Sequence, residues 1–379
     1  MKVHITLVGG QPAPVYHGIV ATNPDRVVYI YSKNTEYVFK KLKSLVRVPV
    51  DEIPALDTTD PIKISECARM LSDRYCDDDV TLNISSGLKT WSHLFGIVFD
   101  KLPNAAVVYM DQNNKLWNYK TMQCTDDFVF DMDLLFILYD NELTHYRKFS
   151  DYTDDDTDVA MRLEEARRYN HRNFVKLTTV LSKDWAGQLN NQKQGCFEVD
   201  YNNFVEWNKP DHVRLTLWNN RRPSEEWELE SPHAVDLTFN SGWFEYKIAR
   251  MLSHWQYARE IRMNCIFPPI ETKDKSNAVK FPKNEIDIIV DTGTKILFVE
   301  CKTQINNSTD IDKFNTAVKN YGGMGSKALF ITDTRMNEIQ KEKCRESHII
   351  PFSLQDYDSS KVEQMLFKQL NAKLFDINI

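Results

Sequence analysis

The first 120 residues alternate short apolar runs with helical stretches, and this alternation restricts the fold more than any other feature. The apolar runs, rich in Val, Ile and Tyr, are Val3–Val8, Arg26–Tyr31, Ser44–Val50, Val80–Ile84 and Ala105–Met110. The helical stretches between them include Thr35–Lys43, Lys63–Tyr75 and Leu88–Leu102. Continuous apolar strands that alternate with helices are typical of a parallel sheet covered on both faces. The sequence therefore predicts an α/β, Rossmann-like, doubly wound domain.

Two loops of this domain are candidate ligand sites, because such sheets bind ligands beyond the carboxyl ends of their strands. Gly-Gly-Gln-Pro (residues 9–12) follows the first strand, and Asn-Ile-Ser-Ser-Gly-Leu-Lys-Thr (residues 83–90) leads from the fourth strand into a helix. Small residues and N–H groups at a helix N-terminus suit an anion, and Lys89 adds a positive charge. An ordinary serine N-cap explains Ser86 equally well. The chain contains no GxGxxG and no GxxxxGK[ST], so dinucleotide cofactors and P-loop NTP hydrolysis are poorly supported.

The stretch Asn284–Gln304, NEIDIIVDTGTKILFVECKTQ, has the pattern of a β-hairpin. Alternating apolar residues run from Ile286 to Val290 and resume from Leu297 to Cys301, with a turn at residues 291–294. A two-residue loop would direct three charged side chains to the same face of the hairpin, because side chains alternate along a strand. These three are Asp287, Glu300 and Lys302.

Two carboxylates beside a lysine can hold a divalent cation and direct a positive charge at the same point. That is the chemistry of metal-assisted phosphodiester cleavage. The alternative is a solvated polar face on a half-buried hairpin. A bulge or an odd loop length would also separate the three side chains.

Composition excludes several classes of function. The net charge of −7 makes the chain no global polycation, so any nucleic acid must be bound by local basic patches. Seven cysteines without a CxxC pair indicate neither a disulfide framework nor a zinc site. Apolar runs such as Leu134–Tyr139 are too short to span a bilayer, and the N-terminus enters a strand without a signal-peptide layout. We therefore expect a cytoplasmic protein without membrane contact.

The acidic run Asp151–Asp158 is the clearest boundary in the chain, and acidic runs of this kind are expected to be solvated turns and linkers. A helix over 159–181 is predicted to follow, decorated with Arg and His. The aromatic-rich stretch Gly195–Trp227, with Arg214, Arg221 and Arg222, could clamp a single nucleic-acid strand or form a small sheet that packs the two halves together. We predict three parts: a sensor-like domain at 1–148, a linker and intermediate region at 149–235, and a second α/β domain at 236–379.

The second domain is expected to begin with a helix from Ser241 to Leu252. Glu245 lies next to its buried stripe, from which it can reach a metal site or extend into solvent. After the hairpin, the sequence predicts a helix at 306–319, strands at 327–332 and 349–354, and a closing helix at 362–375. Helix, hairpin, helix and strand make an α/β core.

This half resembles the PD-(D/E)xK nuclease superfamily. Asp287 takes the family's Asp position, Glu300-Cys301-Lys302 its ExK, and Glu245 the acidic position on the first core helix. The sequence departs from the family in lacking the leading Pro, since Glu285-Ile286 precedes Asp287. The resemblance implies that Asp287, Glu300 and the Cys301 carbonyl coordinate Mn²⁺ or Mg²⁺. It also implies that Glu245 is a further ligand or a general base, and that Lys302 orients water or stabilises developing charge.

The N-terminal half resembles a CARF domain, the CRISPR-associated Rossmann fold, through its two loops. The combination matches the CARF–nuclease ancillary effectors of type III CRISPR systems. The resemblance implies a homodimer that binds a cyclic oligoadenylate, usually cyclic tetra-adenylate, and then cleaves DNA, RNA or both. The implied ligand-binding residues are Gly9, Gly10, Gln11, Pro12, Ser85, Ser86, Gly87, Lys89 and Thr90.

Other functions remain open at this stage. One is a constitutive nuclease of repair or restriction type whose Rossmann domain is a scaffold. Another is a non-enzymatic, ligand-sensing regulator with a decayed nuclease fold, against which the intact Asp287, Glu300 and Lys302 argue. A third is a CARF domain that degrades its own activator. The sequence leaves open the ring size of the activator, the preferred metal, DNA versus RNA, and strandedness.

Overall fold

The computed structural model describes residues 1–111, 114–125, 131–179, 187, 189–220, 222–268, 285–305, 307–322 and 326–376. Predicted positions outside these ranges are Phe128, Leu181, Arg221, Asn284, Asn306 and residues 323–325, and the side chain of Arg222 is not described either. The chain forms two compact units. The first comprises Met1–Glu142 with the short segments Gly293–Ile296 and Tyr321–Ser326. The second comprises Leu143–Thr292, Leu297–Asn320 and Lys327–Ile379.

The first unit contains a seven-stranded sheet in the order β3-β2-β1-β4-β5-β6-β7. Its strands are β1 (Lys2–Leu7), β2 (Arg26–Ile30), β3 (Val50–Glu52), β4 (Asp79–Asn83), β5 (Ala105–Met110), β6 (Leu116–Asn118) and β7 (Gln123–Thr125). The first five pair in parallel, and β6 and β7 extend the sheet antiparallel. The strand order reverses between β1 and β4, so the loops after these two strands open at the same crevice.

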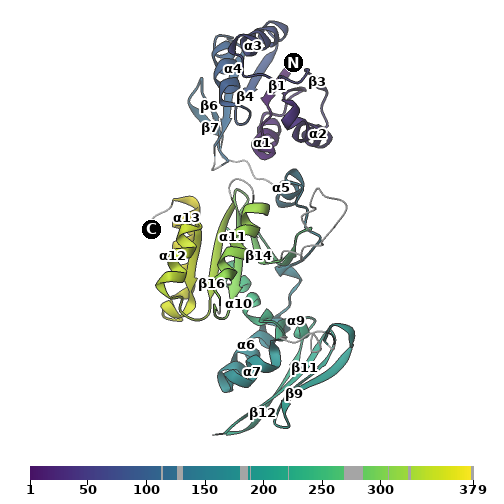
Figure 1. Ribbon diagram of the computed structural model, residues 1–379, viewed down its shortest axis with the longest axis vertical. Helices are drawn as coiled ribbons and strands as arrows, with labels where there is room; N and C mark the ends of the chain where they lie inside the picture. Colours follow the sequence, from purple (N-terminus) through teal and green to yellow (C-terminus); the bar gives the residue numbers. More distant parts are fainter. Residues whose placement is uncertain are drawn as a thin grey trace. The chain divides into compact units, whose positions relative to one another are not determined.

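Helices cover both faces of this sheet, as predicted. They are α1 (Pro12–Thr22), α2 (Glu36–Leu45), α3 (Pro61–Arg74), α4 (Lys89–Asp100) and α5 (Met132–Leu138). Within this unit, α3 and α4 lie together on one side of β1 and β4, and α1 and α2 lie on the other (Figure 1). Phe95 and Phe99 of α4 pack with Ile5 and Leu82 of the sheet in a fully buried cluster. The doubly wound α/β prediction is confirmed.

One local prediction in this unit is wrong. Residues 44–50 are not a strand, because α2 continues to Leu45 and β3 begins only at Val50. Val38, Phe39 and Leu42 are buried at helical spacing, and Leu45 continues that spacing. Of the histidines on these helices, His93 of α4 is exposed and His17 of α1 is buried.

The second unit contains a six-stranded sheet in the order β17-β16-β15-β14-β13-β8. Its strands are β8 (His145–Lys148), β13 (Glu260–Ile266), β14 (Glu285–Asp291), β15 (Ile296–Lys302), β16 (Ser326–Thr332) and β17 (Ile349–Ser353). The β13 strand pairs antiparallel with both β14 and β8, and β16 pairs in parallel with β17. The connection between β14 and β15 spans four residues, 292–295, rather than the predicted two. Two extra residues preserve the alternation of faces, so the predicted polar face survives.

The helices of this core are α10 (Gly242–Ser253), α11 (Thr309–Tyr321), α12 (Glu338–Glu346) and α13 (Val362–Phe375). Apolar side chains of α10, the sheet and α13 form one buried cluster that includes Phe244, Ile288, Val299, Leu329 and Leu366. The predicted helix, hairpin, helix and strand therefore follow in this order, but β13, which was not predicted, lies between α10 and the hairpin. Cys301 belongs to this cluster and is 3% exposed, as expected for a side chain on the apolar face of the hairpin.

A smaller antiparallel sheet lies beside a group of helices in the same unit (Figure 1). Its strands are β9 (Gln194–Asp200), β10 (Asn203–Asn208), β11 (His212–Asn219) and β12 (Arg222–Glu230). One face buries Val205, Trp207 and Leu215 in the same cluster as α6 (Asp154–Tyr169), α7 (His171–Thr178) and α9 (Ala234–Thr238). On the other face, Arg214 is held by three glutamates, Glu206, Glu226 and Glu228. The structure thus favours packing over a nucleic-acid clamp for this stretch.

The acidic run is not a solvated linker. Asp154, Asp155 and Asp156 form the first turn of α6, which Thr153 caps in a reciprocal capping box with Asp156. The Asp156 side chain is fully buried and lies 3.0 Å from Nδ1 of His233. Acidic residues at this end of a helix interact favourably with its dipole. The helix predicted over 159–181 is two helices, separated at Asn170, which caps α7.

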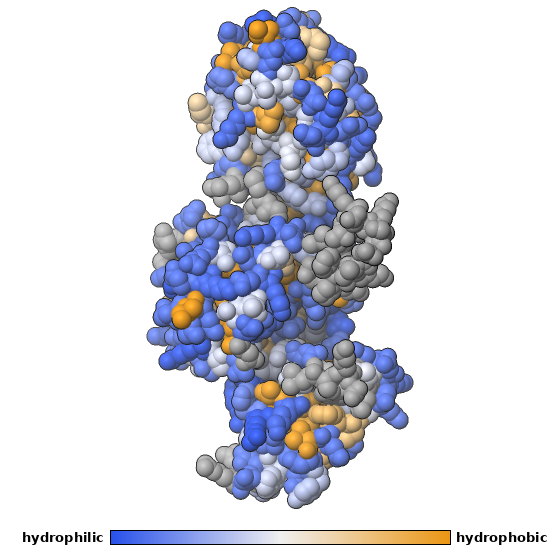
Figure 2. Space-filling view, viewed as in Figure 1, coloured by the Kyte–Doolittle hydropathy of each residue, from blue (hydrophilic) through white to orange (hydrophobic). Residues whose placement is uncertain are grey.

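Hydrophilic residues predominate on the face shown in Figure 2, and hydrophobic ones form small separate groups. None of the helices in the described ranges combines the length and the apolar character that a membrane crossing requires. All seven cysteines lie in described parts of the chain and are free thiols.

Candidate active site and ligand crevice

The N-terminus of α10 carries Glu245. Ser241 precedes the helix in the left-handed conformation, and Gly242 approaches the backbone of α9 so closely that a Cβ would lie 2.1 Å from the Asp236 carbonyl oxygen. Only glycine fits such an approach. Trp243 and Phe244 are buried on either side of the helix start, so the first turn of α10 is fixed and Glu245 projects into a cavity.

The hairpin brings the three predicted side chains together. The Lys302 Nζ lies 2.6 Å from Oε1 of Glu300 and 3.8 Å from Oδ2 of Asp287. The Cys301 N–H donates a 2.7 Å hydrogen bond to Oδ2 of Asp287. Alternation of side chains along β15 places Glu300 and Lys302 on one face, and this backbone bond fixes Asp287 beside them. The predicted shared face is therefore present in the structure.

The carboxylates of this cluster are hard to ionise together. Burial, and then the charge of Asp287, raises the pKa of Glu300 to about 8. Burial also raises the pKa of Asp287, and burial followed by Asp287 raises that of Glu245 well above its ordinary value. Burial opposes the charge on Lys302, but Asp287 and Glu300 outweigh it and raise its pKa. The single ammonium of Lys302 thus lies beside more carboxylates than it can neutralise.

The donor chemistry of the cluster fits a divalent cation. Carboxylate oxygens are the preferred ligands of Mg²⁺ and Mn²⁺, and a second cation would relieve the repulsion that raises these pKa values. Among the described residues there is no ready-made cage of three or more acidic, His or Cys ligands, and Lys302 contacts the two carboxylates instead. Burial raises the pKa of the Cys301 thiol, so the sulfur is protonated and unsuited to ligation. Any contribution of Cys301 to a metal site comes from its backbone.

A cavity of about 750 Å³ lies in front of these side chains. Glu245, Asp287 and Lys302 line one wall, together with Glu285. The rest of the lining comes from β8, from the α9–α10 region and from the corner between β10 and β11. A cavity of this size, closed on one side by carboxylates and open to solvent elsewhere, can accept a segment of a flexible substrate.

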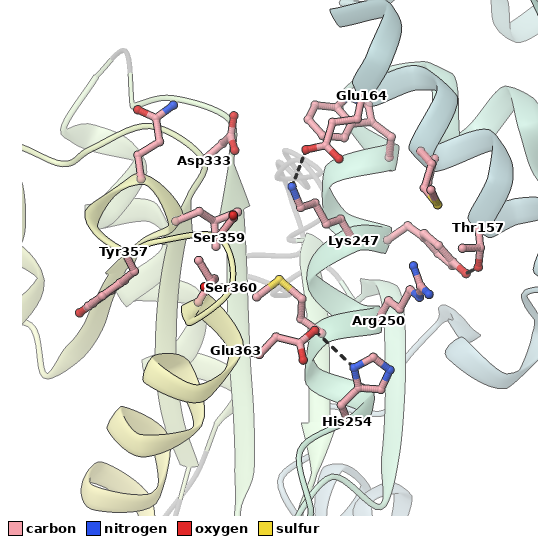
Figure 3. Close-up of a pocket in the computed structure, with 18 of the residues that line it drawn as sticks. Thr157, Glu164, Lys247, Arg250, His254, Asp333, Tyr357, Ser359, Ser360 and Glu363 are labelled. Carbon is pink, nitrogen blue, oxygen red and sulfur yellow. Dashed lines mark hydrogen bonds and ion pairs between the residues drawn. The ribbon is translucent and has the colours of Figure 1, made fainter. Parts of the chain in front are cut away.

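The opposite face of α10 borders a second cavity, of about 640 Å³. Figure 3 shows Lys247, Arg250 and His254 of α10 on one side and Ser359 and Ser360 on the other. Two ion pairs lie at its edges, Lys247 with Glu164 at 2.6 Å and His254 with Glu363 at 3.3 Å. Helix α10, which carries Glu245, therefore lies between two cavities of the same unit.

A buried ion pair supports the end of β15 from behind. Arg167 of α6 lies 2.6 Å from Asp333, and its guanidinium stacks 5.3 Å from the ring centre of Trp243. The backbone N–H of Asp333 donates to the carbonyl of Lys302. Both side chains of the pair are about 85% buried or more (15% and 13% exposed). This contact fixes the position of Lys302 relative to the helix that carries Glu245.

In the first unit, the two predicted loops meet at the crevice between β1 and β4. The Gly9 N–H donates a 3.0 Å hydrogen bond to Oγ of Ser86, whose hydroxyl reaches the Gln11 carbonyl at 3.4 Å. A Cβ on Gly9 would lie 2.6 Å from the backbone nitrogen of Gly87, and Gly87 has a φ of +84°. The two loops therefore pack against each other at positions that only glycine can occupy.

This contact separates the predicted ligand residues into two groups. The Ser85 hydroxyl accepts from the Met110 N–H at 2.7 Å, so it holds the end of β5. Ser86 is not the N-cap, because Leu88 occupies that position without a capping side chain. Pro12 is buried at the start of α1. The exposed members are Gly10, Gln11, Lys89 and Thr90.

Several residues that line the cavity beside Asp287 were not predicted from the sequence. Glu285 adds a carboxylate whose pKa is raised by loss of solvent and by Asp287. Asn264 sits at an irregularity of β13 with a φ of +51°, a conformation unusual for a residue other than glycine. Lys209, at the corner after β10, lines the far side. Glu285 lies two residues before Asp287, so the alternating pattern of the strand places both on one face. Asn264 and Lys209, by contrast, reach the cavity only through tertiary packing.

Comparison with known proteins adds a fold relationship over the whole chain. No family model and no curated protein matches the sequence. Among solved structures, Can2 from Sulfobacillus thermosulfidooxidans in complex with cyclic tetra-adenylate is 13% identical, with 99% of each chain covered and a TM-score of 0.66. The protein VC1899 from Vibrio cholerae is also 13% identical, with 98% of each chain covered and a TM-score of 0.67.

A third structure has a narrower overlap. It is a type III CRISPR defence DNA nuclease activated by cyclic oligoadenylate, 15% identical, with a TM-score of 0.52. The match covers 87% of this chain but only 45% of that nuclease. At these identities the likeness establishes a shared fold, an architecture with two α/β parts as the sequence predicted.

Proposed function

We propose that this chain is a cyclic-oligoadenylate-activated, divalent-metal-dependent nuclease that cleaves DNA, RNA or both in type III CRISPR defence. The observation that carries the proposal is the contact of Lys302 with Glu300 and Asp287 at the mouth of a cavity. Its context supports the proposal, since the fold is that of Can2, a protein solved with cyclic tetra-adenylate, over 99% of both chains.

The crevice of the first unit is the proposed sensor site. It lies at the strand-order reversal, where doubly wound sheets bind ligands, and it offers backbone N–H groups and the exposed Lys89. A second copy of the chain would present the same loops about a two-fold axis, which suits a ring with two-fold symmetry. We therefore propose a homodimer with cyclic tetra-adenylate as the first candidate ligand.

The second unit is the proposed catalytic unit. Asp287, Glu300 and the Cys301 carbonyl would hold Mn²⁺ or Mg²⁺, which when bound supplies Lewis acidity and a more acidic water. Lys302 stays protonated, since its pKa is raised, and can donate hydrogen bonds to the phosphate oxygens as charge develops there. Glu245, whose pKa is raised, can accept or return a proton near neutral pH.

The decisive test is a cleavage assay with Mn²⁺, with and without a panel of cyclic oligoadenylates, on single- and double-stranded DNA and RNA. We expect cleavage that depends on both the metal and one ring size. Cleavage without any activator would favour a constitutive nuclease with a scaffold Rossmann domain. No metal-dependent cleavage under any activator would favour a non-enzymatic sensor. Loss of the ring during incubation with metal-free protein would reveal degradation of the activator.

Glu300→Ala identifies the site. We expect this change to abolish cleavage, by at least 100-fold, because one of the metal-binding carboxylates is lost. Binding of the cyclic oligonucleotide, measured by calorimetry, should be unchanged, since Glu300 belongs to the other unit. Glu346→Ala, at the exposed end of α12, is the matched control. Full cleavage by Glu300→Ala would remove the hairpin from the mechanism.

A further inference from the structure

The cavity that contains Glu245 and Asp287 also has basic side chains in its lining, referred to below as the basic wall. His145 and Arg147 of β8 line it together with Lys209, which lies between β10 and β11. These side chains come from two segments remote in sequence from the hairpin, an edge strand and a corner of the small sheet. A cavity lined by both basic side chains and carboxylates binds differently from one with carboxylates alone.

Lys209 is the least neutralised cation of this wall. Its Nζ donates to the backbone carbonyls of Leu189 and Asn190, and the described residues offer it no carboxylate partner. By contrast, Arg147 is paired with Asp236 at 2.7 Å. Carbonyl oxygens orient an ammonium but leave its net charge in place. The lysine therefore presents a fixed positive charge to the cavity.

A nucleic-acid strand that enters the cavity needs a positive charge such as that of Lys209. Its phosphates must approach Glu245, Asp287 and Glu285, which repel them, and Lys302 alone does not balance that repulsion. The outer face of the small sheet offers no alternative path, since Glu206, Glu226 and Glu228 surround its Arg214. The route that minimises repulsion passes between the hairpin and the basic wall.

We propose that Lys209, supported by His145 and Arg147, is a substrate-positioning residue that binds a phosphate next to the scissile one. This inference rests on the proposed nuclease function and adds the direction from which the strand is held. Recognition of phosphate without contact to bases makes the contribution independent of sequence. The interaction is an exposed charge contact, so salt must weaken it.

The test compares Lys209→Gln with the original full-length chain. Glutamine keeps N–H donors for the carbonyls of Leu189 and Asn190 but removes the charge. We expect KM for a single-stranded oligonucleotide to rise about 5- to 10-fold, with kcat within about twofold, because the lost contact positions rather than reacts. The slope of log affinity against log salt should fall by about 0.7, the value for one phosphate contact on a single strand. Affinity is measured by anisotropy in the non-cleaving Glu300→Ala background.

Three controls separate the outcomes. Lys193→Gln, an exposed lysine that precedes β9 and does not line the cavity, should leave KM and the salt slope unchanged. Lys209→Arg should retain most of the affinity. A melting temperature that falls in Lys209→Gln, with the salt slope unchanged, would assign the lysine a structural role and overturn the proposal.

Failure of the inference is distinguishable from failure of the proposed function. If the original chain cleaves with metal and activator and Lys209→Gln has the same KM and salt slope, only the inference falls. If the original chain neither cleaves nor binds any nucleic acid under these conditions, the nuclease proposal falls and the inference falls with it.

Discussion

At the level of single residues, the cluster around Lys302 is defined by an imbalance of charge. The ammonium of Lys302 contacts Glu300 and approaches Asp287, while the pKa values of Glu245, Asp287 and Glu300 are all raised. Burying carboxylates without full compensation is unfavourable. A cation that bound to this cluster would therefore compete with protons.

Metal binding should depend steeply on pH. Glu300 has a pKa of about 8 without metal, so below pH 8 it carries a proton that a cation must displace. We expect Mn²⁺ affinity to rise by about tenfold per pH unit between pH 6 and 8 and to level off above that. Calorimetric titrations at pH 6, 7 and 8 measure this slope. A slope that is the same in Glu300→Gln would show that another group carries the proton.

Two buried histidines should make the first unit sensitive to acid. Burial lowers the pKa of His4 to about 3 and that of His17 to about 4. The unfolded chain takes up these protons below about pH 6.5, whereas the folded chain does so only near pH 4 and below. Stability is thus fully present above about pH 6.5 and falls as pH is lowered towards 4, by about 3 kcal/mol for His17.

Hydrogen exchange in β1 and α1, corrected for intrinsic rates, measures this loss between pH 7 and 5. His17→Gln should reduce the pH dependence of α1 while His93→Gln, at an exposed position of α4, should not. Equal pH dependence in all three proteins would contradict the assignment to buried histidines.

For helices and strands, the sequence predicts the features that depend on a local residue pattern. The parity of the hairpin follows from alternation alone, so the shared face of Asp287, Glu300 and Lys302 could be predicted even though the connection is two residues longer than expected. Strand and helix order in the first unit follows in the same way. Helix ends are less predictable, because a short apolar run fits both the 3.6-residue period of a helix and the two-residue period of a strand. The extension of α2 to Leu45 is an example.

Contacts between distant segments could not be predicted. Asp156 looked like part of a solvated run, yet it is buried against His233, which is 77 residues away. The basic wall of the catalytic cavity has the same origin, since β8 and the β10–β11 corner reach the hairpin only through the sheet order and the packing of the small sheet. The residues of the site that carry an alternating pattern were therefore predicted, as was Glu245 through the family resemblance, whereas those from β8 and the β10–β11 corner were not.

The ion pair behind β15 should be important for both stability and activity. Arg167→Ala leaves Asp333 buried without its partner, which we expect to destabilise the second unit by about 3–5 kcal/mol. The change should also reduce cleavage, because the Asp333 N–H holds the Lys302 carbonyl. Urea unfolding measures the first effect and the cleavage assay the second.

The neighbouring Arg168 provides a matched control. It is 70% exposed and pairs with Glu164, so Arg168→Ala should change stability by less than about 1 kcal/mol. Similar losses in Arg167→Ala and Arg168→Ala would show that the buried pair has no special role.

At the scale of the whole molecule, the proposal joins a sensor to a catalytic unit. Lys89 is the exposed charge at the crevice of the first unit and lies far in sequence from the hairpin. Lys89→Ala should raise the activator concentration needed for half-maximal cleavage by about 10-fold, since one charge-assisted contact to a phosphate is lost. Maximal cleavage should be retained at saturating activator.

Lys101→Ala, at the end of α4 and also exposed, is the control for this measurement. Unchanged dependence on activator in Lys89→Ala would remove this loop from the sensor, and loss of maximal cleavage would place Lys89 in the coupling between sensing and catalysis rather than in binding.

The close packing of Gly9 against Ser86 and Gly87 has a consequence for the rate of ligand binding. Both loops are already held together by a backbone hydrogen bond and by contacts with no space for a Cβ. A ligand that enters the crevice therefore loses little chain entropy in ordering them. Its arrival should be a single fast step limited by encounter, and rings of different size should differ mainly in how long they stay.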